Sequence, residues 1–194
     1  MAALTASDRQ RLIALIQAYT PFNPTEAAHQ TAVLDLLATS DRPLDRENYK
    51  PGHITGSAWV VDQAANQVGL IFHHRFAMWL QPGGHVDAGE TDLLAVTLRE
   101  VWEEMGITVD PKHATLFDID VHPIPETTVH PCHIHFDIRF LCRVEAQPIL
   151  PGSDAEQGRW FALDELDQIA RDEGMQRMLD KCLQSGILQR SSQQ

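Results

Sequence analysis

Residues 83–107 read GGHVDAGETDLLAVTLREVWEEMGI and carry more information than any other part of the chain. Within them, residues 93–105 have the periodicity of a helix, which turns by about 100° per residue. Glu103 therefore lies about 60° to one side of Glu100, and Glu104 lies about 40° to the other side. The three carboxylates share one face of the predicted helix. The apolar residues expected on the opposite face, against a core, are Leu94, Leu98, Val101, Trp102 and Met105.

Three like charges on one helical face call for a compensating cation. Glu residues three or four positions apart destabilise an isolated helix by about 0.2–0.5 kcal/mol per pair. Mg²⁺ or Mn²⁺ is the expected cation, because both prefer hard oxygen ligands. Gly83 and Gly84, before the helix, allow backbone atoms to approach a ligand closely. Gly106 follows the helix at a position where the left-handed conformation is common.

This stretch resembles the signature of the Nudix hydrolases, Gly-x5-Glu-x7-Arg-Glu-U-x-Glu-Glu-x-Gly-U, in which U is a bulky aliphatic residue. The one departure is that eight residues, and not seven, separate Glu90 from Arg99. The matching residues are Gly84, Glu90, Arg99, Glu100, Val101, Glu103, Glu104, Gly106 and Ile107.

The resemblance implies a fold, a reaction and a metal site. The fold implied is an α/β/α sandwich around a mixed sheet. The reaction implied is attack by water on a diphosphate linkage between a nucleoside diphosphate and another group. Glu100, Glu103 and Glu104 would bind Mg²⁺ or Mn²⁺ together with the carbonyl of Gly83. Arg99 would orient the helix by pairing with a loop carboxylate, either Glu90 or Asp92.

The resemblance leaves the general base and the type of activity open. Glu100 is one candidate base; Glu156 and Glu126 are candidates for a base or a further ligand from outside the signature. The predicted catalytic residues are thus Glu103, Glu100, Arg99 and Glu156. The alternatives to a hydrolase are a catalytically silent Nudix domain that senses a nucleotide or binds a partner, and a Nudix-related diphosphate isomerase.

A second candidate site lies on the strand predicted at residues 132–144. Its period of two places His133, His135, Asp137 and Arg139 on one face. We expect this face to line the substrate cavity, together with His85; a solvent-facing strand is the alternative. His133, His135 and Asp137 also have the spacing of a cupin-type transition-metal site.

The remainder of the chain predicts a helical extension followed by one α/β domain. Residues 1–50 contain a helix at 7–19 and a second helix that begins after the N-cap Asn23, with Glu26 at the capping-box position. Residues 51–194 are expected to form the domain that resembles the Nudix hydrolases. Its further strands are expected at 54–62, 68–74, 107–109, 116–121 and 158–162, and its further helices at 163–171 and 174–184.

Composition limits the partners. The 194 residues include 15 Lys and Arg against 27 Asp and Glu, a formal charge of −12, so we expect no nucleic-acid partner. A small phosphorylated substrate is compatible with this charge when a bound metal supplies positive charge.

The sequence also predicts the location of the protein. It has no apolar run of about 20 residues, no signal peptide and no disulfide framework, so we expect a cytoplasmic protein without membrane contact. Cys132 and Cys142 are expected to be buried. Residues 1–50 are expected to cap the pocket, form a homodimer interface or pad the fold.

Overall fold

The computed structural model describes residues 4–74, 76–152, 155–169 and 172–190. The chain divides into two compact units, each built from separate segments. The first unit comprises Met1–Gly56, Gly84–Val96 and Asp118–Arg139, and the second comprises Ser57–Gly83, Thr97–Phe117 and Phe140–Gln194.

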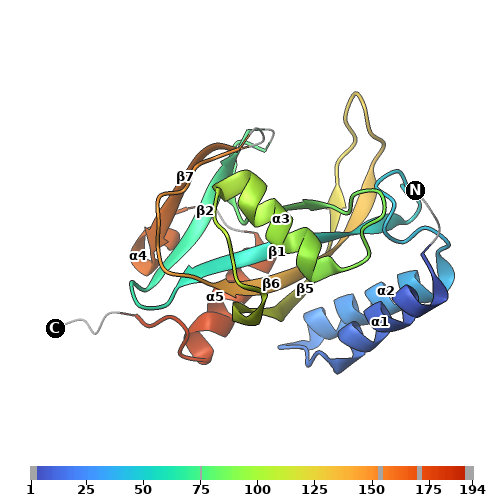
Figure 1. The fold of residues 1–194 in the computed structure, drawn as a ribbon, viewed down its shortest axis with the longest axis horizontal. Coiled ribbons are helices and arrows are strands. Elements are labelled where there is room, and N and C mark those ends of the chain that lie inside the picture. The colour runs from blue at the N-terminus through green and yellow to red at the C-terminus, as the bar shows by residue number, and fades with distance from the viewer. Residues whose placement is uncertain (1–3, 75, 153–154, 170–171, 191–194) are drawn as a thin grey trace. The chain divides into compact units, whose positions relative to one another are not determined.

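Helices α1 (Ala6–Ala18) and α2 (Pro24–Thr39) open the first unit and lie side by side (Figure 1). The predicted N-cap is confirmed, because the Asn23 side chain accepts a hydrogen bond from Glu26 N at 2.9 Å. The buried Glu26 side chain reaches beyond its own helix and accepts from Ile119 N at 3.0 Å. Helix α2 is thereby hydrogen-bonded to strand β5.

Seven strands form one sheet in the described part of the chain, and their order is β3-β2-β1-β6-β5, with β4 on β1 and β7 on β2. Their bounds are β1 Gly52–Asp62, β2 Gln67–His73, β3 Met78–Leu80, β4 Gly83–His85, β5 Ala114–Ile124, β6 His133–Arg143 and β7 Ala155–Ala162. The remaining helices are α3 (Leu93–Met105), the 3₁₀ turn Pro111–His113, α4 (Leu163–Leu166) and α5 (Glu173–Gln184).

The prediction of a strand at residues 107–109 is wrong. Ile107 and Val109 are buried and Thr108 is exposed, so the alternation of the sequence reports burial correctly. No ladder forms at these residues, because alternation alone does not supply a hydrogen-bonding partner. The helix expected at 163–171 ends at Leu166, and residues 170 and 171 lie outside the described residues.

In the second unit, helices pack on both faces of strand β2. Val68 and Leu70 of β2 pack with Met175 and Leu179 of α5 in one cluster. A Cβ atom on Gly69, the intervening residue, would lie 2.7 Å from Met105 Cε of α3. Helices α3 and α5 therefore cover opposite faces of β2, as expected for a sandwich.

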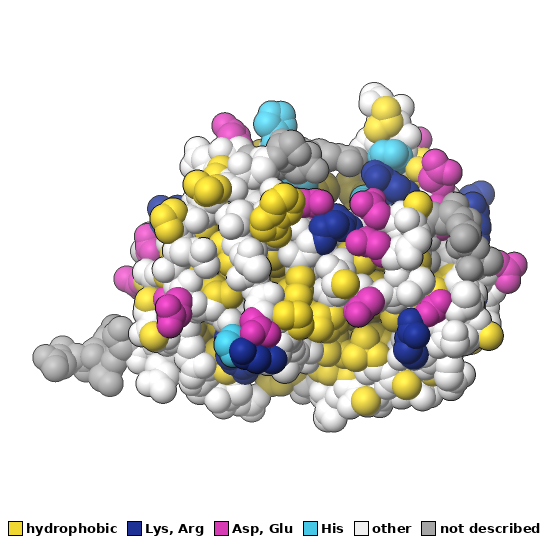
Figure 2. Space-filling view, in the orientation of Figure 1, with side chains coloured by type: hydrophobic (Ala, Val, Ile, Leu, Met, Phe, Trp, Pro, Cys, Tyr) yellow, Lys and Arg dark blue, Asp and Glu magenta, His cyan; other side chains and the backbone are white. Residues whose placement is uncertain are grey.

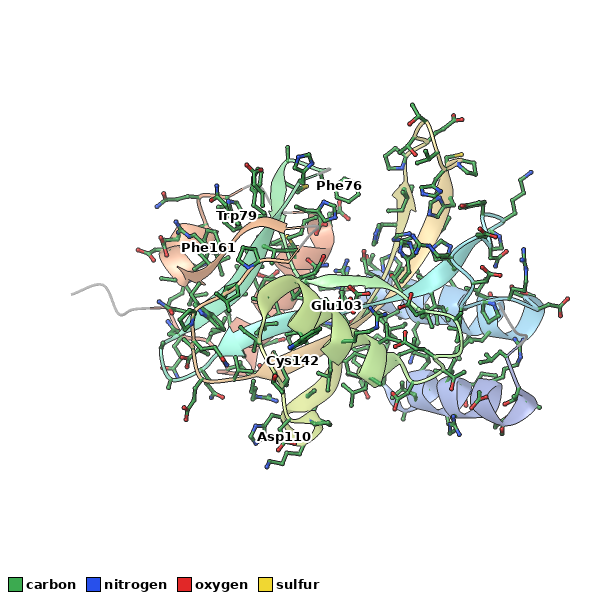
Figure 3. All side chains as sticks on the ribbon, turned by 45° about the horizontal axis from the view of Figure 1, so that its top comes forward. Phe76, Trp79, Glu103, Asp110, Cys142 and Phe161 are labelled. Carbon is green, nitrogen blue, oxygen red and sulfur yellow. The ribbon has the colours of Figure 1, made fainter. Side chains whose placement is uncertain are left out.

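Aromatic rings close this core at β3 and β7. Trp79 packs edge-to-face on Phe161 with 4.8 Å between ring centroids, and Figure 3 shows the two side chains next to each other. Strand β7 runs beside β2 and leads into α4 (Figure 1). None of the described helices combines the length and the apolar character that a membrane crossing requires.

The three cysteines differ in environment. Cys142 and Cys182 are buried, and burial raises the pKa of each thiol to about 12. Cys132 is exposed just before β6, so its expected burial is wrong. It lies in the loop that precedes the strand, where the chain has not yet entered the packed sheet.

We expect a thiol reagent to modify Cys132 alone in the folded protein, because the thiolate is the reactive form and the other two thiols are inaccessible. Mass spectrometry after iodoacetamide treatment at pH 8 should find one adduct, three in urea and none in folded Cys132→Ser. Labelling of Cys142 or Cys182 at the rate of Cys132 in the native protein would contradict this account.

Candidate functional site

Helix α3 begins and ends where the sequence predicts, but its faces divide differently. Glu100 and Glu104 lie on its buried side with 9% and 6% exposure, whereas Glu103 is exposed. Trp102, expected against the core, is 60% exposed. The buried arc is centred near Glu104, so Trp102 falls outside it. Residues that share this buried arc are Leu93, Val96, Thr97, Val101 and Met105.

The partial burial of two carboxylates has an energetic consequence. Moving an ionised carboxylate out of water is costly unless a cation or hydrogen-bond donors compensate it. Arg99 supplies part of the compensation, because its Nη1 atom donates to Glu100 Oε1 at 2.8 Å and to Glu103 Oε2 at 2.9 Å. Acidic side chains lie beside Lys or Arg side chains around α3 in Figure 2, and Figure 3 shows Glu103 on this helix.

The third carboxylate is held by the glycine-rich turn. Glu104 Oε2 accepts a hydrogen bond from Gly83 N at 2.9 Å, which brings together two residues predicted to share a metal. The helix stops at Gly106, whose φ of +67° is the left-handed conformation expected there. The structure thus places Gly83 against the carboxylate helix.

A loop before β7 completes the end of α3. Leu150 N donates to Met105 O at 2.8 Å, and Gly152 N donates to Glu104 O at 3.4 Å. A Cβ atom on Gly152 would lie 1.9 Å from Glu103 O, so only glycine fits at this approach. Carbonyl groups at the end of a helix lack partners within the helix, and this loop supplies them.

Glu156 lies within β7, four residues after Gly152, and not in a loop as expected. Phe72 of β2 pairs with Gln157 and His73 pairs with Ala155, so the register skips Glu156 and the strand bulges there. Bulges are common beside active sites, where they redirect a side chain. The other outside candidate, Glu126, is exposed and follows the end of β5 in the first unit.

The loop carboxylates that the sequence offered as partners for Arg99 have local roles. Glu90 Oε2 accepts from Asp87 N at 2.8 Å, within the glycine-rich turn. Asp92 Oδ1 accepts from Leu94 N at 3.0 Å at the start of α3. Pairing of Arg99 with either carboxylate stays a prediction.

Two of the polar residues on β6 form a buried ion network. Arg139 is 1% exposed and donates through Nε to Asp137 Oδ2 at 2.7 Å. Its Nη2 atom donates to Asp120 at 3.0 Å, and Nη1 lies 3.4 Å from Asp118. Burial alone would lower the pKa of Arg139, but these three carboxylates outweigh it and raise the pKa above its ordinary value. The alternative of a solvent-facing strand is therefore wrong for these residues.

The two histidines of β6 join a different group. His135 lies among His53 of β1 and His85 of β4, with ring centroids 4.9 and 5.2 Å away. His133 stacks on His53 with centroids 5.1 Å apart. Burial and neighbouring histidines lower the pKa of His53 to about 4, of His85 to about 3 and of His135 to about 2. The rings are therefore neutral near pH 7. Sequence reasoning missed His53, because nothing in the alternation of β1 marks it.

Comparisons of the sequence with known proteins identify relatives of this chain. The family model described as NUDIX domain matches residues 53–182. The phosphatase NudJ of Escherichia coli K12 is 33% identical over 122 residues, which cover 60% of this chain and 67% of NudJ.

Solved structures give the same result. The mutator protein MutT of Bacillus halodurans is 27% identical with a TM-score of 0.52, covering 66% of this chain and 79% of its own. The NUDIX domain of Shewanella oneidensis NrtR, solved with ADP ribose, shares the fold at 15% identity with a TM-score of 0.56; the match covers 78% and 96% of the two chains. Both the sequence match and the mixed α/β fold lead to one conclusion: the chain belongs to the Nudix hydrolase family.

Proposed function

We propose that this protein is a Mg²⁺- or Mn²⁺-dependent hydrolase that cleaves a diphosphate linkage between a nucleoside diphosphate and another group. The observation that carries the proposal is the set of three carboxylates on one turn of α3, two of them buried. A catalytically silent domain has no need to keep all three. Membership of this chain in the Nudix hydrolase family is a second support for the proposal.

The residues present fit a hard divalent cation. Carboxylate and carbonyl oxygens are the ligands that Mg²⁺ and Mn²⁺ prefer. Oxygens of Glu100 and Glu103 both lie within hydrogen-bonding distance of the single Nη1 atom of Arg99, so one positive centre can reach both. Glu104 and the carbonyl of Gly83 complete the proposed ligand set. When bound, the metal neutralises phosphate charge and lowers the pKa of a water molecule.

The protein's own residues hold and orient the reactants. Arg99 fixes the Glu100 and Glu103 side chains, and the loop at Gly152 fixes the backbone of the last turn of α3. We assign Glu156, at the bulge of β7, to accept the proton of the attacking water or to act as a further ligand. Glu100 is the alternative base. Contact of substrate with His133, His135, Asp137, Arg139 and His85 stays a prediction, as do the homodimer, the division at residue 50 and the cytoplasmic location.

A substrate panel tests the proposed function. We expect phosphate-containing products from at least one nucleoside diphosphate derivative with Mg²⁺ or Mn²⁺, and none with excess EDTA. The panel would contain nucleoside triphosphates, nucleotide sugars, dinucleoside polyphosphates and coenzymes, with products separated by chromatography. Metal-independent turnover, or conversion of a diphosphate to an isomer without hydrolysis, would overturn the proposal.

A further inference from the structure

We propose that His53, His85 and His135 form a binding site for a transition-metal ion of the Zn²⁺ class. These three residues belong to the first unit, and none of them is in the carboxylate set of α3. The proposal does not depend on the hydrolase reaction. It rests on the arrangement of the rings, on one buried nitrogen and on the chemistry of imidazole.

The arrangement brings three ligand atoms close together. One nitrogen from each of the three rings lies within 4.8 Å of the other two. A tetrahedral Zn²⁺ with Zn–N bonds of about 2.0–2.1 Å requires nitrogens about 3.4 Å apart. His85 and His135 are only partly buried, so rotation of their rings can close the remaining gap without moving the strands. The three strands that carry the rings provide a rigid frame.

His53 has the hydrogen bonding of a metal ligand. Its Nδ1 atom lies 3.3 Å from the carbonyl oxygen of Asn48, which can only accept, so Nδ1 carries the proton. The lone pair of the neutral ring is therefore on Nε2. That atom is fully buried and has no hydrogen-bond partner among the described residues. A buried acceptor without a donor is costly, and a metal ion would satisfy it.

A neighbouring histidine gives His135 a similar support. His133 Nδ1 lies 2.8 Å from the carbonyl oxygen of Pro131, so it donates and leaves the lone pair of His133 on Nε2. This atom lies 3.2 Å from His135 Nε2, which then donates to it. Hydrogen bonds of this kind orient the imidazole ligands of metal sites and fix their tautomers.

The donor set selects the class of ion. Three neutral imidazoles are the ligands of zinc, cobalt, nickel and copper sites, whereas Mg²⁺ and Mn²⁺ prefer oxygen. Three protein ligands leave a fourth position open for water or for a ligand oxygen. We commit to Zn²⁺, because its tetrahedral geometry suits three converging histidines. This set differs from the cupin-type alternative of His133, His135 and Asp137, since Asp137 binds Arg139 and Thr55.

Titration of the chelator-treated protein with Co²⁺, a spectroscopic substitute for Zn²⁺, tests the site. We expect a visible absorption band of tetrahedral or five-coordinate Co²⁺ with one equivalent bound, and displacement of that band by Zn²⁺. His85→Ala and His135→Ala should each weaken Zn²⁺ binding by about tenfold or more. Because His53 is fully buried, His53→Gln serves only as a supplementary variant whose fold is checked by circular dichroism.

Two controls separate this site from others. His113→Ala removes an exposed histidine of the 3₁₀ turn and should leave the Co²⁺ band unchanged. Glu103→Gln alters the carboxylate set and should also leave it unchanged. The proposal is overturned by a band that survives the His85→Ala/His135→Ala double variant, by a band lost in Glu103→Gln, or by a wild-type protein that shows weak octahedral Co²⁺ absorption and no intense band.

Discussion

Replacement of Glu103 by glutamine should lower kcat/KM for metal-dependent hydrolysis by more than about 100-fold, since loss of a group that merely orients a metal ligand already costs 10–100-fold. The amide keeps the size of the side chain but removes its negative charge, and an amide oxygen is a weaker ligand for Mg²⁺ than a carboxylate oxygen. Glu103 is exposed, so the substitution should leave the free energy of unfolding nearly unchanged. Steady-state kinetics over a range of Mg²⁺ concentrations, with the substrate found in the panel, measures the effect.

The matched control is Glu145→Gln, which removes an exposed carboxylate of the same unit outside the helix. It should keep wild-type kinetics and the wild-type dependence on Mg²⁺. If Glu103→Gln hydrolysed the substrate at the wild-type rate at every Mg²⁺ concentration, the proposed role of the α3 carboxylates would be wrong.

Replacement of Arg139 by methionine should lower the free energy of unfolding by about 3–5 kcal/mol, the usual cost of removing one partner from a buried ion pair. Methionine replaces the apolar stem of Arg139 and carries no charge, so Asp118, Asp120 and Asp137 would lose their cation. Stability of small proteins is about 5–15 kcal/mol in total, so this loss is a large part of it. Urea denaturation followed by tryptophan fluorescence measures the change.

Arg190→Gln provides the comparison for this prediction. Arg190 forms an exposed ion pair with Asp167 at 2.6 Å, and such pairs contribute little to the free energy of unfolding because solvent screens the charges. The ratio of the two effects distinguishes a buried network from a general effect of removing arginine. A value for Arg139→Met as small as that for Arg190→Gln would show that the network does not stabilise the fold.

The sequence predicted those features that depend on local patterns. The bounds of α3, the N-cap Asn23 and the left-handed Gly106 follow from periodicity and from residue types with few alternatives. The signature carboxylates followed from spacing on one helix. In each case the residues that determine the feature lie close together in the sequence.

Features that depend on distant partners could not be predicted in this way. The alternation of β6 indicated a polar face, but the acids that bury Arg139 include Asp118 and Asp120 of another strand. The buried side of α3 is likewise set by what packs on it, which is why Trp102 was placed wrongly. His53 and His85 are separated from His135 by 50 or more residues of sequence, and no short motif joins them.

The bulge at Glu156 means that a deletion or insertion in β7 has different effects at different positions of the strand. Side chains alternate between the two faces of a strand, so removal of one residue from its regular part exchanges the faces of everything on one side of the deletion. Residue 156 is the exception, because Ala155 and Gln157 already pair with the adjacent residues His73 and Phe72. Deleting residue 156 would therefore restore a regular ladder with β2, keep Phe161 opposite Val68, and remove only the carboxylate that the bulge carries. Comparisons of this segment between relatives should therefore be aligned by strand register, with the extra residue treated as part of the fold.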